Sequence, residues 1–209
     1  MKLDIPHYKQ EKTLSCGLAA LRMVFSYYGN KTFEKELTND TKIHSFGILT
    51  TDLGIIALKL GYKVKIYTFH LPLLSPHKFA FGKEIKMEDL SKIKPDPKSK
   101  LTYESWEKYL ESGGELIWEY PKIEIIKSLI ENKIPCIVAV NTAALGNYWR
   151  SWDNGHFFVI NGIDDKNVFV LDPAETKEKA AYEIDDELLL SSVSINARVS
   201  AGYLVAIEK

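Results

Sequence analysis

Four residues spread along the chain have the types that acyl chemistry requires: Gln10, Cys16, His156 and Asp172. A cysteine thiolate can attack a carbonyl carbon, and an imidazole can carry the protons that the reaction moves. A carboxylate beside the imidazole fixes its tautomer, and an amide can donate a hydrogen bond to the oxyanion that the attack creates. The question is whether the elements around these residues bring the four side chains together.

Cys16 opens a segment with helical periodicity. Its apolar residues fall on one stripe, at Leu18, Leu21, Val24 and Phe25. Ser15 is a candidate N-cap and Gly29 a candidate stop, which predicts a helix of about twelve residues. A thiol in the first turn faces unpaired backbone N–H groups and the positive end of the helix dipole, which stabilise the thiolate. Cys136 instead lies in the apolar run 134–140, where we expect a buried, unreactive thiol.

Gln10 lies six positions before Cys16, in a segment too polar to belong to a core. On its own, a glutamine in such a segment is a surface residue. Next to a helix that starts at a cysteine, its amide could donate to an oxyanion together with the backbone N–H of Cys16. We therefore treat Gln10 as a candidate oxyanion donor.

The chain has five histidines, of which we select His156 as the imidazole partner because it opens an apolar strand. His70 and His77 lie in a segment rich in proline and lysine, where we expect surface positions. His44 lies in a short polar connection, and nothing that flanks His7 would hold an imidazole.

His156 and Asp172 are expected to meet across a hairpin. If the turn centres on Asp164, His156 pairs directly with Asp172 on the same face of the sheet. A register shift of two would still leave them diagonal neighbours. The Asp172-Pro173 dipeptide is also typical of a turn that ends a strand, and both interpretations can hold together.

The pattern of apolar residues predicts the remaining elements. Helices are expected at 51–60, 122–132 and 185–192 in addition to the one that begins at Cys16. Strands are expected at 62–69, 136–141, 156–163, 167–172 and 201–208. Helices come first and a strand-rich half follows, which predicts an α+β fold with a largely antiparallel sheet.

The composition indicates one folded domain over residues 1–209. The chain is 45% apolar and 26% charged, with a net charge of −1, so it has no basic surplus for a nucleic-acid backbone. We expect no signal peptide and no membrane span. Two cysteines cannot form a disulfide framework, so we expect reduced thiols and a cytoplasmic location.

Residues 70–115 read as an insertion over the core, as a lid or a specificity element.

The motifs also carry a resemblance to a known family. The stretch QEKTLSCGLAAL, from Gln10 through Cys16, resembles the nucleophile segment of the C39-like peptidases. These are papain-fold cysteine peptidases best known for cleaving bacteriocin leaders. The stretches GHFFVING (155–162) and VFVLDP (168–173) resemble the histidine and aspartate segments of that family, in matching order.

The resemblance covers roughly residues 1–70 and 120–173, and it implies a papain-like fold whose nucleophile helix packs on a mainly antiparallel sheet. It implies four roles: Cys16 as nucleophile, His156 as general base and acid, Asp172 as orienting carboxylate and Gln10 as oxyanion donor. It further implies a peptide or protein substrate, and it calls for no metal or other cofactor.

Four further residues are candidates for contact with the substrate: Gly17, Trp149, Trp152 and Gly155. The two tryptophans belong to an aromatic loop, with Tyr148, that should rim a cleft. Packing over the histidine and aspartate would explain these aromatic residues equally well.

The leading hypothesis is a cysteine peptidase that cleaves a peptide or isopeptide bond through an acyl-enzyme on Cys16. The same residues could pass the acyl group to an amine or deamidate a glutamine, and a papain-fold module could bind peptides without catalysis. A metal site built from Cys16, His156 and Asp172 ranks last, because no local ligand spacing supports it. The oligomeric state does not follow from the sequence.

Overall fold

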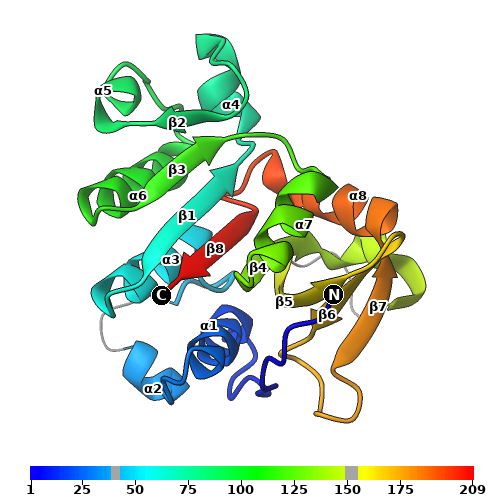
Figure 1. Cartoon of the computed structure of the whole chain (residues 1–209). Coiled ribbons are helices and arrows are strands. Elements are labelled where there is room, and N and C mark those ends of the chain that lie inside the picture. Colours follow the sequence, from blue (N-terminus) through cyan, green and yellow to red (C-terminus); the bar gives the residue numbers. More distant parts are fainter. Residues whose placement is uncertain (39–42, 149–154) are drawn as a thin grey trace.

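One eight-stranded sheet runs through the computed structural model, which describes residues 1–38, 43–148 and 155–209. The strands are β1 (Lys63–Thr68), β2 (Lys83–Ile85), β3 (Glu115–Trp118), β4 (Cys136–Asn141), β5 (Gly155–Ile163), β6 (Asn167–Leu171), β7 (Ala181–Asp185) and β8 (Leu204–Glu208). Their order across the sheet is β2-β3-β1-β8-β4-β5-β6-β7 (Figure 1). Only the β1–β3 pair is parallel among these neighbours, so the expectation of a mainly antiparallel sheet is confirmed.

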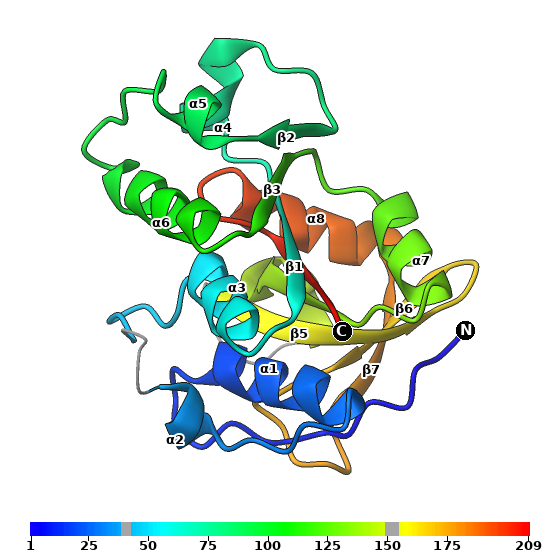
Figure 2. The same ribbon diagram turned by 60° about the vertical axis from the view of Figure 1, so that its left-hand side comes forward.

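Helices cover the sheet and fill the connections. They are α1 (Cys16–Tyr27), α2 (Glu34–Leu37), α3 (Thr50–Lys59), α4 (Leu71–Leu74), α5 (Met87–Leu90), α6 (Lys100–Glu111), α7 (Ile123–Glu131) and α8 (Asp186–Ala197), with 3-10 turns η1 (Ser75–His77) and η2 (Thr142–Tyr148). Helix α1 packs against β5, α3 against β1, and α8 against β4. Figure 2 shows α1 running below the strands, next to α2. Among the described helices, none combines the length and apolar character needed to cross a membrane.

Helix α1 has the predicted start, length and end. It begins at Cys16 and spans 12 residues. Its end is a Schellman motif, in which the N–H of Asn30 bonds to the carbonyl of Phe25 and the N–H of Gly29 to that of Ser26. Gly29 has a φ of +84°, a left-handed conformation that glycine adopts without strain.

The segment 70–115 adds three helices and β2, which pairs with β3 and forms one edge of the sheet. Its α6 packs on α3, and the side chains of Trp106 and Tyr109 are completely buried. The Tyr109 ring lies so close to Gly54 of α3 that a Cβ on this glycine would come within 2.6 Å of it. These contacts anchor the segment to the core, and its function as a lid or specificity element stays a prediction.

The expected surface position of His70 is wrong. His70 is only 2% exposed, because it caps the short helix α4 by accepting a hydrogen bond from the N–H of Leu73 and packs edge-on against Trp106. Burial lowers the pKa of His70 and so favours the neutral ring.

Candidate active site

Cys16 is the first residue of α1 and lies almost entirely below the surface, at 9% exposure. Its backbone N–H therefore belongs to the first turn, where the helix offers no intrahelical acceptor. Ser15 occupies the N-cap position, but its side chain makes no capping bond. Its hydroxyl oxygen instead accepts a 3.0 Å hydrogen bond from the N–H of Lys12, which closes a tight loop before the cysteine.

His156 and Asp172 form a buried pair. The Nε2–H of His156 donates a 2.8 Å hydrogen bond to Oδ1 of Asp172, and the carboxylate is 0% exposed. The same oxygen accepts a 2.8 Å bond from the N–H of Ala174. With Nε2 engaged, the ring presents Nδ1 to a further partner, and the Cys16 thiol lies close enough to raise the pKa of the ring. The fold thus brings together the three predicted residues.

The strand register that brings His156 and Asp172 together differs from the direct pairing that we expected. Opposite Leu171 the structure places Val159, so His156 and Asp172 are diagonal neighbours rather than a direct pair. The register shifts at a bulge between Ile160 and Gly162. At the bulge, the carbonyl of Asn161 accepts a 2.6 Å bond from the N–H of Leu3, so the N-terminal segment occupies this point of the sheet.

The electrostatic environment favours the protonated form of His156. Burial alone lowers the pKa of the imidazole, but hydrogen bonds to Asp172 and Cys16, together with the charges of both, raise it from 6.5 to about 9. Cys136 lies in β4, and burial raises the pKa of its thiol to about 12. The two cysteines therefore differ in their surroundings: Cys16 lies at the cleft beside His156, and Cys136 is completely buried, while the reactivity of Cys16 stays a prediction.

Gln10 lies on the loop before α1, half-buried. Its Nε2 donates hydrogen bonds to the carbonyls of Lys12 at 2.7 Å and Thr13 at 2.9 Å. The amide is thus fixed to the loop that leads to Cys16. Its contact with an oxyanion stays a prediction.

A cleft of about 320 Å³ opens beside Cys16 and His156. Three of its lining residues are apolar side chains with high exposure: Phe46, Leu101 and Val199, at 59%, 40% and 66%. Gly155 lines the cleft, as the sequence suggested for a substrate contact. Leu101 comes from the 70–115 segment, which therefore contributes to the wall.

The other predicted substrate contacts have different outcomes. Gly17 is buried, and a Cβ on it would lie 2.6 Å from the side chain of Ile48, so its place in the structure is explained by the close packing of α1. Trp149 and Trp152 lie outside the described residues, as does the side chain of Tyr148.

Within the described ranges, no group of three or more His, Cys, Asp or Glu side chains is arranged to hold a metal ion.

Sequence reasoning missed His7. Its Nε2 donates a 2.8 Å hydrogen bond to the backbone carbonyl of Asp172, so a histidine with no supportive neighbours in sequence contacts the candidate orienting residue. This contact joins residues 165 positions apart, and no local pattern carries a signal for it.

Comparison with known proteins places this geometry in a family. The model of the Peptidase_C39 like family matches residues 2–193. A double glycine motif protease from an AMS/PCAT transporter, solved in complex with the leader peptide, is 18% identical with a TM-score of 0.52, over 99% of this chain and 93% of that chain. The peptidase domain of Streptococcus ComA, a bifunctional ABC transporter, is 14% identical with a TM-score of 0.51, over 96% of each chain.

A third solved structure, of a putative C39-like peptidase from Bacillus anthracis, is 13% identical with a TM-score of 0.58 and covers 100% of this chain and 98% of that chain. A search of curated proteins finds no match. The similarity of fold confirms the papain-like C39 architecture that the motifs implied.

Proposed function

The chain belongs to the Peptidase_C39 like family, and from this premise we propose that it is a cysteine peptidase that cleaves a peptide or isopeptide bond. The observation that carries the proposal is the buried His156–Asp172 pair, whose ring lines one cleft together with Cys16 at the start of α1. Nucleophile, base and orienting group stand in the order that this chemistry needs.

The proposed reaction has two stages. In the resting pair His156 already carries the proton of Cys16, and the thiolate sulfur attacks the carbonyl carbon of the scissile bond. The backbone N–H of Cys16 donates to the oxyanion, and so does the amide of Gln10 once it gives up one of its bonds to the carbonyls of Lys12 and Thr13. The C–N bond then breaks, and the imidazolium gives its proton to the leaving amine. In the second stage, His156 removes a proton from water, which attacks the thioester and releases the acid.

The cleft indicates the kind of substrate. Its exposed apolar residues Phe46, Leu101 and Val199 suit an apolar side chain of a peptide, and Lys98 is a cation on the same wall. A relative of similar fold was solved with a leader peptide, which supports a peptide as the ligand. We propose that the substrate is a peptide or a protein segment that lies across this cleft.

The experiment that tests the proposal uses two small probes. Acylation by p-nitrophenyl acetate should release a burst of p-nitrophenolate from the wild-type chain and none from Cys16→Ala. Alkylation by iodoacetamide between about pH 5 and pH 9, read by mass spectrometry, should modify Cys16 at low pH and lose that reactivity in His156→Ala. Cys136 is the internal control, because its buried thiol should stay unmodified in the folded chain.

The result that would contradict an enzymatic function is equally clear. If Cys16 is neither acylated nor more reactive than in His156→Ala, the chain lacks an activated nucleophile. The fold would then serve as a peptide-binding module instead.

A further inference from the structure

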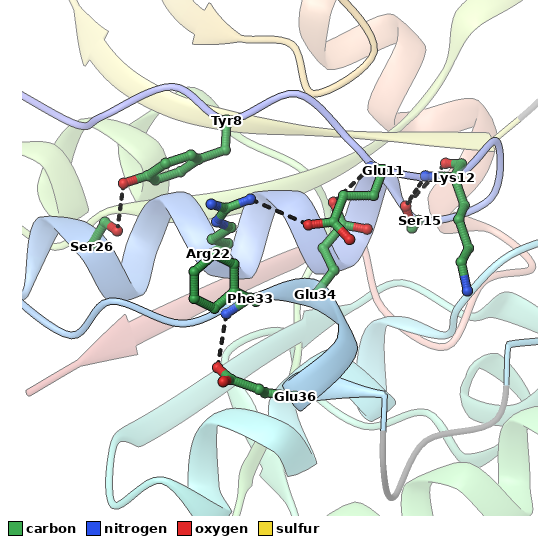
Figure 3. Close-up of polar contacts among 9 residues, drawn as sticks. All are labelled: Tyr8, Glu11, Lys12, Ser15, Arg22, Ser26, Phe33, Glu34 and Glu36. Carbon is green, nitrogen blue, oxygen red and sulfur yellow. Dashed lines mark hydrogen bonds and ion pairs between the residues drawn. The ribbon is translucent and has the colours of Figure 1, made fainter.

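A buried carboxylate outside the proposed catalytic group contacts the loop that precedes Cys16. Glu34, the first residue of α2, is only 3% exposed. Its Oε1 accepts a 2.9 Å hydrogen bond from the backbone N–H of Glu11, and Ser15, whose hydroxyl donates a 3.0 Å bond to the carbonyl of Lys12, lines the same small pocket. Figure 3 shows this carboxylate below the stretch that runs from Glu11 to Ser15. We propose that Glu34 is a positioning residue that holds this loop in the geometry for oxyanion stabilisation, an inference that rests on the proposed function.

The loop connects Glu34 to both candidate oxyanion donors. The carbonyl of Lys12 accepts the 2.7 Å bond from Nε2 of Gln10 and a 3.1 Å bond from the backbone N–H of Ser15. Ser15 directly precedes Cys16, whose N–H is the other donor. Because Glu34 binds the loop at Glu11, and the bonds between Lys12 and Ser15 continue from there to Cys16, a shift of its carboxylate would displace both donors together.

The hydrogen bonds to Glu34 compensate for burying a carboxylate. Burial raises the pKa of Glu34, whereas the nearby Ser15 hydroxyl, the bond from the N–H of Glu11 and the charge of Arg22 act in the opposite direction. Arg22 of α1 also pairs with the Glu11 side chain at 3.5 Å and lies over the Tyr8 ring at 4.1 Å. The loop is therefore held from α2 below and from α1 alongside (Figure 3).

The test compares two reactions of Cys16 in the full chain. Acylation by p-nitrophenyl acetate passes through an oxyanion, whereas alkylation by iodoacetamide does not. Glu34→Ala should lower the acylation rate about tenfold, as expected for the loss of one charge-assisted hydrogen bond, and should leave the alkylation rate nearly unchanged.

Two further variants separate positioning from a merely structural effect. Glu34→Gln keeps an acceptor oxygen for the N–H of Glu11 and should retain most of the acylation rate. Glu34→Asp keeps the charge but shortens the side chain, so it should lose as much rate as Glu34→Ala. In a Gln10→Ala background, Glu34→Ala should lower the acylation rate by a smaller factor than in the wild type. The reason is that both changes remove the same contribution of Gln10 to oxyanion stabilisation.

Glu36→Ala is the matched control on the same helix. Glu36 is exposed, and its Oε2 accepts a 3.0 Å bond from the N–H of Phe33, away from the loop. This variant removes a carboxylate and a helix-capping bond, yet its acylation rate should equal that of the wild type.

Three results would overturn the inference. The first is an unchanged acylation rate in Glu34→Ala, and the second is an acylation rate in Glu34→Gln that is as low as in Glu34→Ala. The third is an acylation rate in Glu36→Ala that is as low as in Glu34→Ala. Each of these requires a wild-type chain that is acylated at Cys16. A wild-type chain that p-nitrophenyl acetate does not acylate would instead refute the proposed function, and the inference with it.

Discussion

The backbone N–H of Gln10 donates a 2.7 Å hydrogen bond to the carbonyl oxygen of Pro173, the residue directly after Asp172. The candidate oxyanion donor and the candidate orienting carboxylate are thus joined through their backbones. His7 adds a second connection through its bond to the Asp172 carbonyl. The segment before α1 therefore spans the region between the nucleophile loop and the end of β6.

Replacing His7 should weaken this connection. His7→Ala removes the donor to the Asp172 carbonyl, so we expect a loss of about 1 kcal/mol in the free energy of unfolding and slower acylation of Cys16. Urea denaturation and the p-nitrophenyl acetate burst measure the two effects. His7→Gln, which can still donate, is the control. An acylation rate in His7→Ala that matches the wild type would show that this contact does not support the site.

Replacing Asp172 should separate the charge of the carboxylate from its role as an acceptor. Asp172→Asn keeps an acceptor oxygen for Nε2–H of His156 but removes the negative charge, so the pKa of His156 should fall below about 9. Asp172→Ala removes the acceptor as well. The reactivity of Cys16 with iodoacetamide at low pH should be highest in the wild type, lower in Asp172→Asn and lowest in Asp172→Ala. Equal reactivity in wild type and Asp172→Ala would contradict the orienting role.

The raised pKa of His156 also predicts how stability depends on pH. The folded chain holds this proton more tightly than the unfolded chain, because the pKa is about 9 rather than 6.5. The resulting stabilisation is complete below pH 6.5 and is lost as the pH rises to about 9. Thermal unfolding of wild type and His156→Gln across this range should show a difference that narrows with rising pH. A difference in thermal stability that stays constant or widens with rising pH would contradict the raised pKa of His156.

Gly54→Ala should destabilise the chain, because its new Cβ would lie 2.6 Å from the ring of Tyr109. Overpacking of this kind costs about 1–3 kcal/mol, which urea denaturation would measure. Gly54→Ala should lower the free energy of unfolding less in a Tyr109→Leu background than in the wild type, since that background lacks the ring. Equal costs in both backgrounds would show that the ring is not the source of the strain.

The parts of the fold that the sequence predicted well are those set by local periodicity. Helix α1, helix α3 and strand β4 begin and end within a residue of their expected bounds, because apolar spacing and flanking glycines determine them. The choice of Cys16, His156 and Asp172 also depended on local context, namely a helix start and two strand ends. The structure brings these three side chains together.

Other features depend on contacts between distant residues, and no local pattern in the sequence indicates them. Strands β2 and β3 have three and four residues, too few for a clear alternation. The bulge near Asn161 follows from pairing with the N-terminal segment. Burial of His70 depends on Trp106 in a helix further along the chain. Burial of Glu34 likewise depends on its partner on the loop before α1.

The place of β8 has a consequence for how the chain acquires its structure during synthesis. Strand β8, Leu204–Glu208, lies between β1 and β4 and joins β2-β3-β1 to β4-β5-β6-β7. Until these residues leave the ribosome, the two groups of strands each expose an unpaired edge where β8 will lie. The sheet therefore closes only after translation has passed residue 208, and the emerging chain is most exposed to misassembly just before that moment.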